Sequence, residues 1–278
     1  MGRVLSSALA AWLLTSSARA LNPTLDISQY GHTVWTLREG MFPGYLEAMA
    51  QTPDGYLWLG TEFGLLRFDG VRFVPWKFPA GQHLSDNFVA GLLAARDGSL
   101  WIGTRKGLAQ WKDGKLTDYA ELASHPIYAL IEDRVGTIWT GTASEEPGKQ
   151  LCAIQGGRVQ CYGDDGSLGK RILSLYEDAA GNLWVIAETG LWRWRPGPPK
   201  LYSEPDFRGQ VLTVSEGNSD NLLVATRHKI LQLVDEGLRT CQLPVPDLQL
   251  HPKSLLRDRD GGVWIGTLDR GLVLSATI

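Results

Sequence analysis

One eight-residue pattern recurs along most of this chain and constrains its fold more than any other feature. Residues 54–61 read DGYLWLGT, residues 97–104 read DGSLWIGT, and residues 260–267 read DGGVWIGT. Less complete copies occupy 135–142, 180–187 and 219–226, and in the last of these Leu223 replaces the tryptophan. The steps between the tryptophan positions are 43, 38, 45, 39 and 41 residues. Six copies at this spacing indicate six structural units of one kind, because repeats of about 40 residues are typical of stacked or radial folds.

Each unit predicts four short strands. An apolar stretch such as 88–94 precedes the Asp-Gly pair, which makes a tight turn because glycine accepts positive φ and aspartate bonds its own backbone. The Leu-Trp-Ile-Gly-Thr segment is the second strand, and its glycine suits close approach between neighbouring units. A Gly-Leu pair begins the third strand, and a turn such as Asp113-Gly114 leads into the fourth. Radial repetition of four-stranded units predicts an all-β fold, a β-propeller of six blades.

The two ends of the chain are predicted to complete one blade. The sixth repeat supplies three strands before Ile278, and an unassigned segment, residues 27–35, lies before the first repeat. In that segment Gln29-Tyr30 resembles fourth-strand positions such as Arg72-Phe73. We expect an N-terminal strand to close the last blade, because an open ring would expose a sheet edge. The alternative is an incomplete arc from a longer array.

The first twenty residues form a separate segment. Arg3 supplies a positive charge, residues 4–14 are mostly apolar, and Ala18-Arg19-Ala20 gives a small-x-small pattern. We therefore expect a signal peptide over 1–20, cleaved after Ala20, and a periplasmic or secreted propeller over 21–278; a buried N-terminal helix is the alternative. No apolar run is long enough to span a bilayer. The net charge of −3, without a basic block, gives no reason to expect nucleic acid as a partner.

Two of the three cysteines flank the Gly156-Gly157 pair of the third repeat. A two-residue hairpin loop places Cys152 opposite Cys161 at a non-hydrogen-bonded site, where Cα atoms lie about 4.5 Å apart. A disulfide can bridge that distance, and an oxidising compartment favours it. Two reduced thiols are the alternative. Cys241 is left over as a small apolar residue.

The sequence offers little catalytic chemistry. The five histidines show no metal-ligand spacing, so we expect no metal and no cofactor, although a site built from separate blades stays open. There is no Gly-x-Ser-x-Gly motif and no phosphate-binding loop. The Asp-Gly pairs resemble the Asp-boxes of sialidases, but the arginine triad of those enzymes is not found. The repeated tryptophans are interpreted as packing between blades; they are Trp58, Trp101, Trp139, Trp184 and Trp264.

A ligand site is expected at the entrance of the central channel, where the first strands of the blades begin. Alignment of the repeats places at this rim residues that vary from blade to blade, as a binding rim requires. They are Tyr45, Phe88, His125, Arg171, Gln210 and His251. Aromatic and hydrogen-bonding groups together suit a carbohydrate or another small polar ligand. Ordinary loop residues are the alternative.

The run Asp-Gly-x-Leu-Trp-Ile-Gly-Thr-x-x-Gly-Leu resembles the repeat of two-component regulator propellers. The opening segment, from residues 29–36 to Gly64-Leu65 and 71–73, is also similar to the start of such sensors. The resemblance covers essentially all of residues 21–278. It implies the extracytoplasmic sensor part of a bacterial hybrid histidine kinase, in which a β-domain, a transmembrane helix and a kinase usually follow. The sequence shows neither a phospho-accepting histidine motif nor an ATP lid.

We therefore expect a non-catalytic extracytoplasmic propeller that senses or binds a ligand and cannot itself phosphorylate a partner. A membrane histidine kinase or a second propeller is the expected protein partner. One alternative is a propeller enzyme of the lyase type, with an acid–base pair drawn from His125, His251 and Glu47 at the rim. Another is a truncated fragment of a longer receptor.

Overall fold

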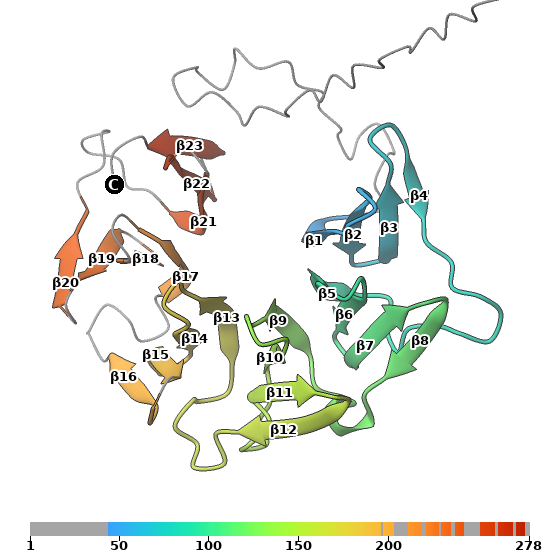
Figure 1. The fold of residues 1–278 in the computed structure, drawn as a ribbon, viewed down its shortest axis with the longest axis horizontal. Coiled ribbons are helices and arrows are strands. Elements are labelled where there is room, and N and C mark those ends of the chain that lie inside the picture. Colours follow the sequence, from blue (N-terminus) through green and yellow to red (C-terminus); the bar gives the residue numbers. More distant parts are fainter. Residues whose placement is uncertain are drawn as a thin grey trace, which may run out of the picture. The chain divides into compact units, whose positions relative to one another are not determined.

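The described part of the chain forms six antiparallel sheets arranged as a six-bladed β-propeller (Figure 1). The structure is a computed structural model, and it describes residues 44–195, 197–202, 211–217, 221–227, 229–234, 237–241, 251–258, 261–268 and 271–275. In every sheet each strand pairs with the next strand of the chain. The predicted fold class is confirmed.

The first three sheets each contain four strands. Sheet 1 contains β1 (Leu46–Gln51), β2 (Leu57–Thr61), β3 (Gly64–Phe68) and β4 (Phe73–Pro75). Sheet 2 contains β5 (Val89–Ala94), β6 (Leu100–Thr104), β7 (Gly107–Lys112) and β8 (Lys115–Asp118), followed by a 3-10 turn at Ala120–Leu122. Sheet 3 contains β9 (Ile127–Glu132), β10 (Ile138–Thr142), β11 (Leu151–Gln155) and β12 (Arg158–Tyr162).

The next two sheets also have four strands, and the last has three described strands. Sheet 4 contains β13 (Ile172–Glu177), β14 (Leu183–Ala187), β15 (Gly190–Arg195) and β16 (Lys200–Tyr202). Sheet 5 contains β17 (Val211–Glu216), β18 (Leu222–Thr226), β19 (Ile230–Val234) and β20 (Gly237–Thr240). Sheet 6 contains β21 (Pro252–Arg257), β22 (Val263–Thr267) and β23 (Leu272–Ser275).

The first strand of each sheet lies closest to the centre of the ring (Figure 1) and contacts the first strand of the next sheet from β1 to β21. Glycine in the second strand allows this close approach. A Cβ atom added to Gly60 would lie 2.7 Å from the side chain of Val89 in the next sheet. The same addition at Gly103 would lie 2.7 Å from the Ile127 carbonyl oxygen. These glycines therefore set the spacing between neighbouring blades.

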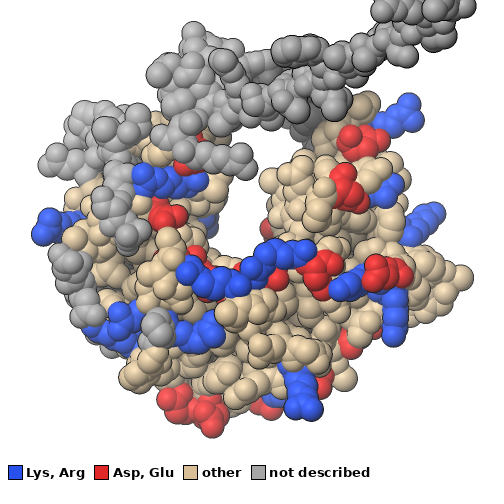
Figure 2. Space-filling model, viewed as in Figure 1, with Lys and Arg blue, Asp and Glu red and all other residues tan. Residues whose placement is uncertain are grey.

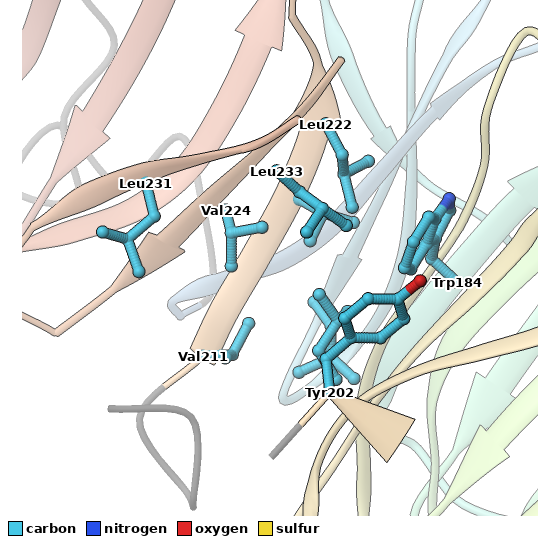
Figure 3. Close-up of a cluster of buried hydrophobic side chains, with 10 residues drawn as sticks. Trp184, Tyr202, Val211, Leu222, Val224, Leu231 and Leu233 are labelled. Carbon is cyan, nitrogen blue, oxygen red and sulfur yellow. The ribbon is translucent and has the colours of Figure 1, made fainter. Parts of the chain in front are cut away.

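The hydrophobic core lies between neighbouring sheets. The repeated tryptophans of the second strands are all buried, with 2–8% of their surface exposed. Figure 3 shows the cluster between sheets 4 and 5, where Trp184 and Tyr202 face Leu222, Val224 and Leu233. From sheet 1 to sheet 6, each sheet thus packs one face against the next sheet. A sheet with apolar faces is stabilised when those faces are covered in this way.

The predicted closing strand lies outside the described residues. Sheet 6 has three described strands, whereas the other five have four. The N-terminal segment expected to supply the fourth strand, residues 27–35, is among the residues that the structure does not describe. Closure of the last blade by an N-terminal strand therefore stays a prediction.

Candidate functional site

The meander order of each sheet places its connections on two opposite faces. We call one of these the loop face. It carries the links after the second strands (residues 62–63, 105–106, 143–150 and 188–189) and the links between sheets (76–88, 119–126 and 163–171). The turn face carries the links from first to second strands: 52–56, 95–99, 133–137 and 178–182. All the predicted rim residues precede a first strand, so those that the structure describes lie on the loop face.

The described rim residues differ in their surroundings. Tyr45 has 70% of its surface exposed. Phe88 is half-buried beneath the guanidinium of Arg105, whose Cζ lies 3.6 Å from the ring centroid. His251 is half-buried, and its carbonyl oxygen accepts the Leu268 N–H. Gln210 lies outside the described residues. These residues come from separate blades.

The structure brings His125 and Arg171 to the two sides of one loop. This loop, residues 143–150, joins β10 to β11 and is much longer than the two-residue links at 62–63, 105–106 and 188–189. The Ala143 N–H donates to the Pro126 carbonyl oxygen, and the Ser144 N–H donates to the Lys170 carbonyl oxygen. The loop therefore bridges the entrances of blades 3 and 4.

A cavity of about 320 Å³ lies between this loop and the start of β13. Its lining residues come from the 143–150 loop, the link before β13 and the link after β14. They are Ala143, Ser144, Glu145, Lys170, Arg171 and Glu188. Of the predicted rim, only Arg171 belongs to this lining.

A buried glutamine holds the loop in shape. Gln150 is 3% exposed, and its side-chain amide donates to the carbonyl oxygens of Ser144 (3.1 Å) and Glu146 (2.8 Å). Its side-chain oxygen accepts the N–H groups of Gly148 and Lys149. These four hydrogen bonds to one buried side chain order the loop around the cavity. Breaking any of them would leave a buried polar group without a partner, which costs free energy.

Opposite charges are interspersed in the cavity. Lys170 Nζ lies 2.6 Å from Glu145 Oε2, and this hydrogen bond raises the pKa of Lys170. The Lys170 backbone N–H donates to Glu188 Oε2 at 2.8 Å. Figure 2 shows one face of the molecule, where a row of Lys and Arg side chains follows the lower edge of the central opening and Asp and Glu side chains lie beside it. Charges of both signs in the cavity lining can bind charged polar groups.

One histidine–carboxylate pair joins the same loop to the link before β9. His125 Nε2 lies 3.8 Å from Glu146 Oε2, which is beyond hydrogen-bond distance. Glu47 is exposed within β1, in another blade. Among the described residues no group of three or more histidine, cysteine, aspartate or glutamate side chains is arranged to hold a metal ion.

The disulfide candidates lie directly after the loop. Cys152 on β11 pairs with Cys161 on β12, with Gln155 opposite Arg158 at the glycine turn. The two sulfur atoms are bonded, and the Cα atoms lie 4.0 Å apart. Cys241 is free and half-buried, and burial raises the pKa of its thiol to about 11.

Sequence reasoning did not identify Glu145, Lys170 and Glu188. The repeat alignment contained one signal that points to them. The step from Trp139 to Trp184 is 45 residues, the longest of the five, and the extra residues form the 143–150 loop. Repeat length thus indicates extra residues in this repeat, although it indicates neither which link contains them nor which side chains line the cavity.

Two segments of the chain, residues 83–106 and 247–269, match the family model described as two component regulator propeller. The chain therefore carries repeats of this type. No curated protein matches the sequence. Among the described residues, none of the helical segments has the length and apolarity needed to cross a membrane.

Several solved structures share the fold at low identity. Virginiamycin B lyase from Staphylococcus aureus is 16% identical, with a TM-score of 0.63 and 84% of each chain covered. The extracellular domain of a proposed one component system from B. thetaiotaomicron is 17% identical, with a TM-score of 0.65; the match covers 83% of this chain and 34% of that one. The extracellular domain of a proposed hybrid two component system from the same organism is 18% identical, with a TM-score of 0.58 and coverages of 84% and 38%. This chain thus spans about a third of the length of the sensor domains that it matches.

Proposed function

We propose that this chain is a non-catalytic sensor propeller that binds a small polar ligand outside the cytoplasm and passes the signal to a partner protein. The observation that carries the proposal is the match of residues 83–106 and 247–269 to the two component regulator propeller. The partner is a membrane histidine kinase or a second propeller, because the chain itself shows no kinase motif.

The architecture of the loop face supports a binding role. The blades share their strand order, and all but the fifth share the repeated tryptophan, whereas their loop-face links differ in residue type and, at 143–150 and between the sheets, in length. Variable loops on a rigid scaffold are a common way to build a binding site. The cavity between blades 3 and 4 is ordered by Gln150, so a ligand would meet a preformed surface and lose little free energy to ordering the loop.

The proposal is tested by a thermal-shift screen of the exported protein against sugars, oligosaccharides, amino acids and short peptides. At least one compound should raise the melting temperature in proportion to its occupancy. Mass spectrometry should then recover that compound unchanged after long incubation. Conversion of the bound compound into a product would contradict a non-catalytic role.

The proposed location has its own test. The signal-peptide pattern at 1–20 supports export with cleavage after Ala20. Edman sequencing of protein from the periplasmic fraction should begin at Leu21. Full-length protein retained in the cytoplasmic fraction would contradict this location.

The His125–Glu146 pair keeps a lyase activity as the second candidate. The two side chains lie on the loop face, and a movement of less than about 1 Å would bring them into hydrogen-bond distance. Loss of virginiamycin B during incubation with the protein, followed by chromatography, would support this candidate. A His125→Ala variant serves as the control, because it removes the only histidine of the pair. An unchanged antibiotic peak would leave the sensor proposal in place.

A further inference from the structure

We propose that the cavity between blades 3 and 4 binds a small molecule that carries both a carboxylate and an ammonium group, such as an amino acid or a short peptide. This inference rests on the proposed ligand-binding function and names its ligand class. It depends on three features of the cavity: an available guanidinium, an available carboxylate, and a lining without aromatic side chains.

Arg171 provides the cationic end. It lies directly before β13, its side chain is exposed, and it lines the cavity. Within the described part of the chain, we find no hydrogen bond or ion pair made by its guanidinium. The neighbouring Lys170 ammonium is already engaged by Glu145 at 2.6 Å. Arg171 is therefore the group that a ligand carboxylate would meet, and the planar guanidinium suits a bidentate contact with it.

Glu188 provides the anionic end. It follows β14 and is exposed, and its Oε2 accepts the Lys170 backbone N–H at 2.8 Å. This bond holds the carboxylate beside the cavity, whose lining includes Glu188, and occupies one of its roughly four acceptor positions. The remaining positions can accept hydrogen bonds from a ligand ammonium. Glu145, whose carboxylate contacts Lys170, gives the cavity a second negative charge.

The lining disfavours the other ligand classes. Two glutamates, one lysine and one arginine give the lining no net charge, so a simple anion would meet two carboxylates as well as two cations. None of the six lining residues is aromatic, and sugars are commonly bound against aromatic rings. The volume of about 320 Å³ suits a small ligand rather than an oligosaccharide. The inference thus narrows the expectation of a carbohydrate or polar ligand to a zwitterion.

Matched peptides test this inference. Tri-L-alanine carries both charges, its N-acetyl form lacks the ammonium, and its C-terminal amide lacks the carboxylate; L-alanine tests the shorter zwitterion. Isothermal titration calorimetry of the exported protein should show saturable binding of tri-L-alanine or L-alanine. Blocking either end should weaken binding at least about tenfold, the effect of losing one charge-assisted contact.

Three variants assign the contacts. Arg171→Gln should weaken the zwitterion at least about tenfold while leaving the affinity for the C-terminal amide nearly unchanged, because that peptide has no carboxylate to lose. Glu188→Gln should likewise weaken binding of the zwitterion at least about tenfold, and it should leave the affinity for the N-acetyl peptide nearly unchanged, because that peptide has no ammonium to lose. Lys106→Gln removes an exposed cation from the 105–106 link of blade 2, outside the cavity, and should leave the affinity for every peptide unchanged. Circular dichroism melting curves verify that all three variants fold.

The outcomes separate this inference from the proposed function. The inference is overturned if neither zwitterion binds at about 10 mM, or if the Arg171 and Glu188 variants bind as the unaltered protein does. A different ligand that binds reversibly to both variants would then leave the sensor proposal standing. Conversely, a zwitterion that binds through Arg171 and Glu188 but is recovered chemically altered would support the cavity and contradict the non-catalytic role.

Discussion

The turn face and the loop face of this propeller are built from the same repeats but differ in what is repeated. On the turn face, Asp133, Asp178 and Asp258 each accept a hydrogen bond from the tryptophan of their own blade, at 2.9, 2.8 and 2.7 Å. Thr52 accepts the equivalent bond from Trp58. On the loop face the links differ in residue type from blade to blade, and the 143–150 link and the links between sheets also differ in length.

The turn face also joins neighbouring blades by the same arginine contact twice. The backbone N–H of Arg96 donates to Glu132 Oε2 of the next blade, and its Nε lies 3.2 Å from Oε1. Arg134 makes the same two contacts with Glu177 of blade 4, at 2.8 and 3.5 Å. One face therefore stabilises the ring, which leaves the other free to vary its loops without loss of the fold.

The largest expected contrast between the faces concerns aromatic side chains. Trp101→Ala removes a ring that is 4% exposed and should lower the free energy of unfolding by about 3–5 kcal/mol through cavity formation. Phe63→Ala removes a loop-face ring that is 61% exposed and should change it by less than about 0.5 kcal/mol. Urea denaturation measures both. Equal losses for the two variants would show that the faces do not differ in this way.

The features that repeat were also the ones that the sequence could predict. The Asp-Gly turns, the tryptophans and the glycine turn between the cysteines recur or follow directly from strand pairing, so local rules were enough to place them. Asp133 and Asp178 were not singled out, because they lie three residues before the glycine and differ from the Asp-Gly aspartates. The cavity was missed because the third repeat has no Gly-Leu after Thr142, so the alignment gave no position for the loop.

The second contrast concerns pH. Asp133 is fully buried; burial alone would raise its pKa, but hydrogen bonds from Trp139, Thr137 and Arg195 outweigh burial and hold the pKa below its ordinary value. Its charge therefore stabilises the fold above about pH 4, and this contribution is lost as the pH falls through the lowered pKa. Asp133→Asn should lower the free energy of unfolding by about 2–3 kcal/mol at pH 7.

Melting temperatures measured between pH 7 and pH 2 check this. The difference between the unaltered protein and Asp133→Asn should be greatest at neutral pH and should shrink below about pH 4. Glu145→Gln is the loop-face control, because its carboxylate pairs with an exposed lysine and contributes little. A constant difference at every pH would contradict the assignment of the effect to the Asp133 charge.

The third contrast compares two exposed arginines. Arg134 donates to the carbonyl oxygens of Asp178 and Ala179 at 2.6 and 2.9 Å, in addition to its contact with Glu177. Arg134→Ala should therefore lower the free energy of unfolding by about 1–2 kcal/mol. Arg171→Ala, on the loop face, should have almost no effect on stability. If Arg171→Ala proved as destabilising as Arg134→Ala, the loop-face arginine would have a structural role and its assignment to ligand binding would weaken.

The smallest expected effect is a gain in stability at Trp101, whose blade has an alanine where blade 1 has the hydrogen-bond acceptor of the repeated tryptophan. Trp101 Nε1 is buried, and within the described residues it has no hydrogen-bond acceptor, because Ala95 occupies the position of Thr52 in blade 1. There the Thr52 hydroxyl accepts from Trp58 Nε1 at 2.9 Å and donates to Asp54 at 2.6 Å. Asp97 stands two residues after Ala95, as Asp54 stands two residues after Thr52.

Ala95→Thr should therefore reproduce the blade 1 bond in blade 2 and raise the free energy of unfolding by about 1 kcal/mol, the net value of one hydrogen bond that satisfies a buried donor. Ala95→Val is the matched control, since valine has nearly the same shape and lacks the hydroxyl. Ala95 is 3% exposed, so valine should give no gain and a small loss from overpacking. Denaturant midpoints of the two variants separate the hydrogen bond from the added volume. A gain of equal size in both would mean that blade 2 was underpacked rather than short of an acceptor, and the equivalence of the turn-face positions would fail at this blade.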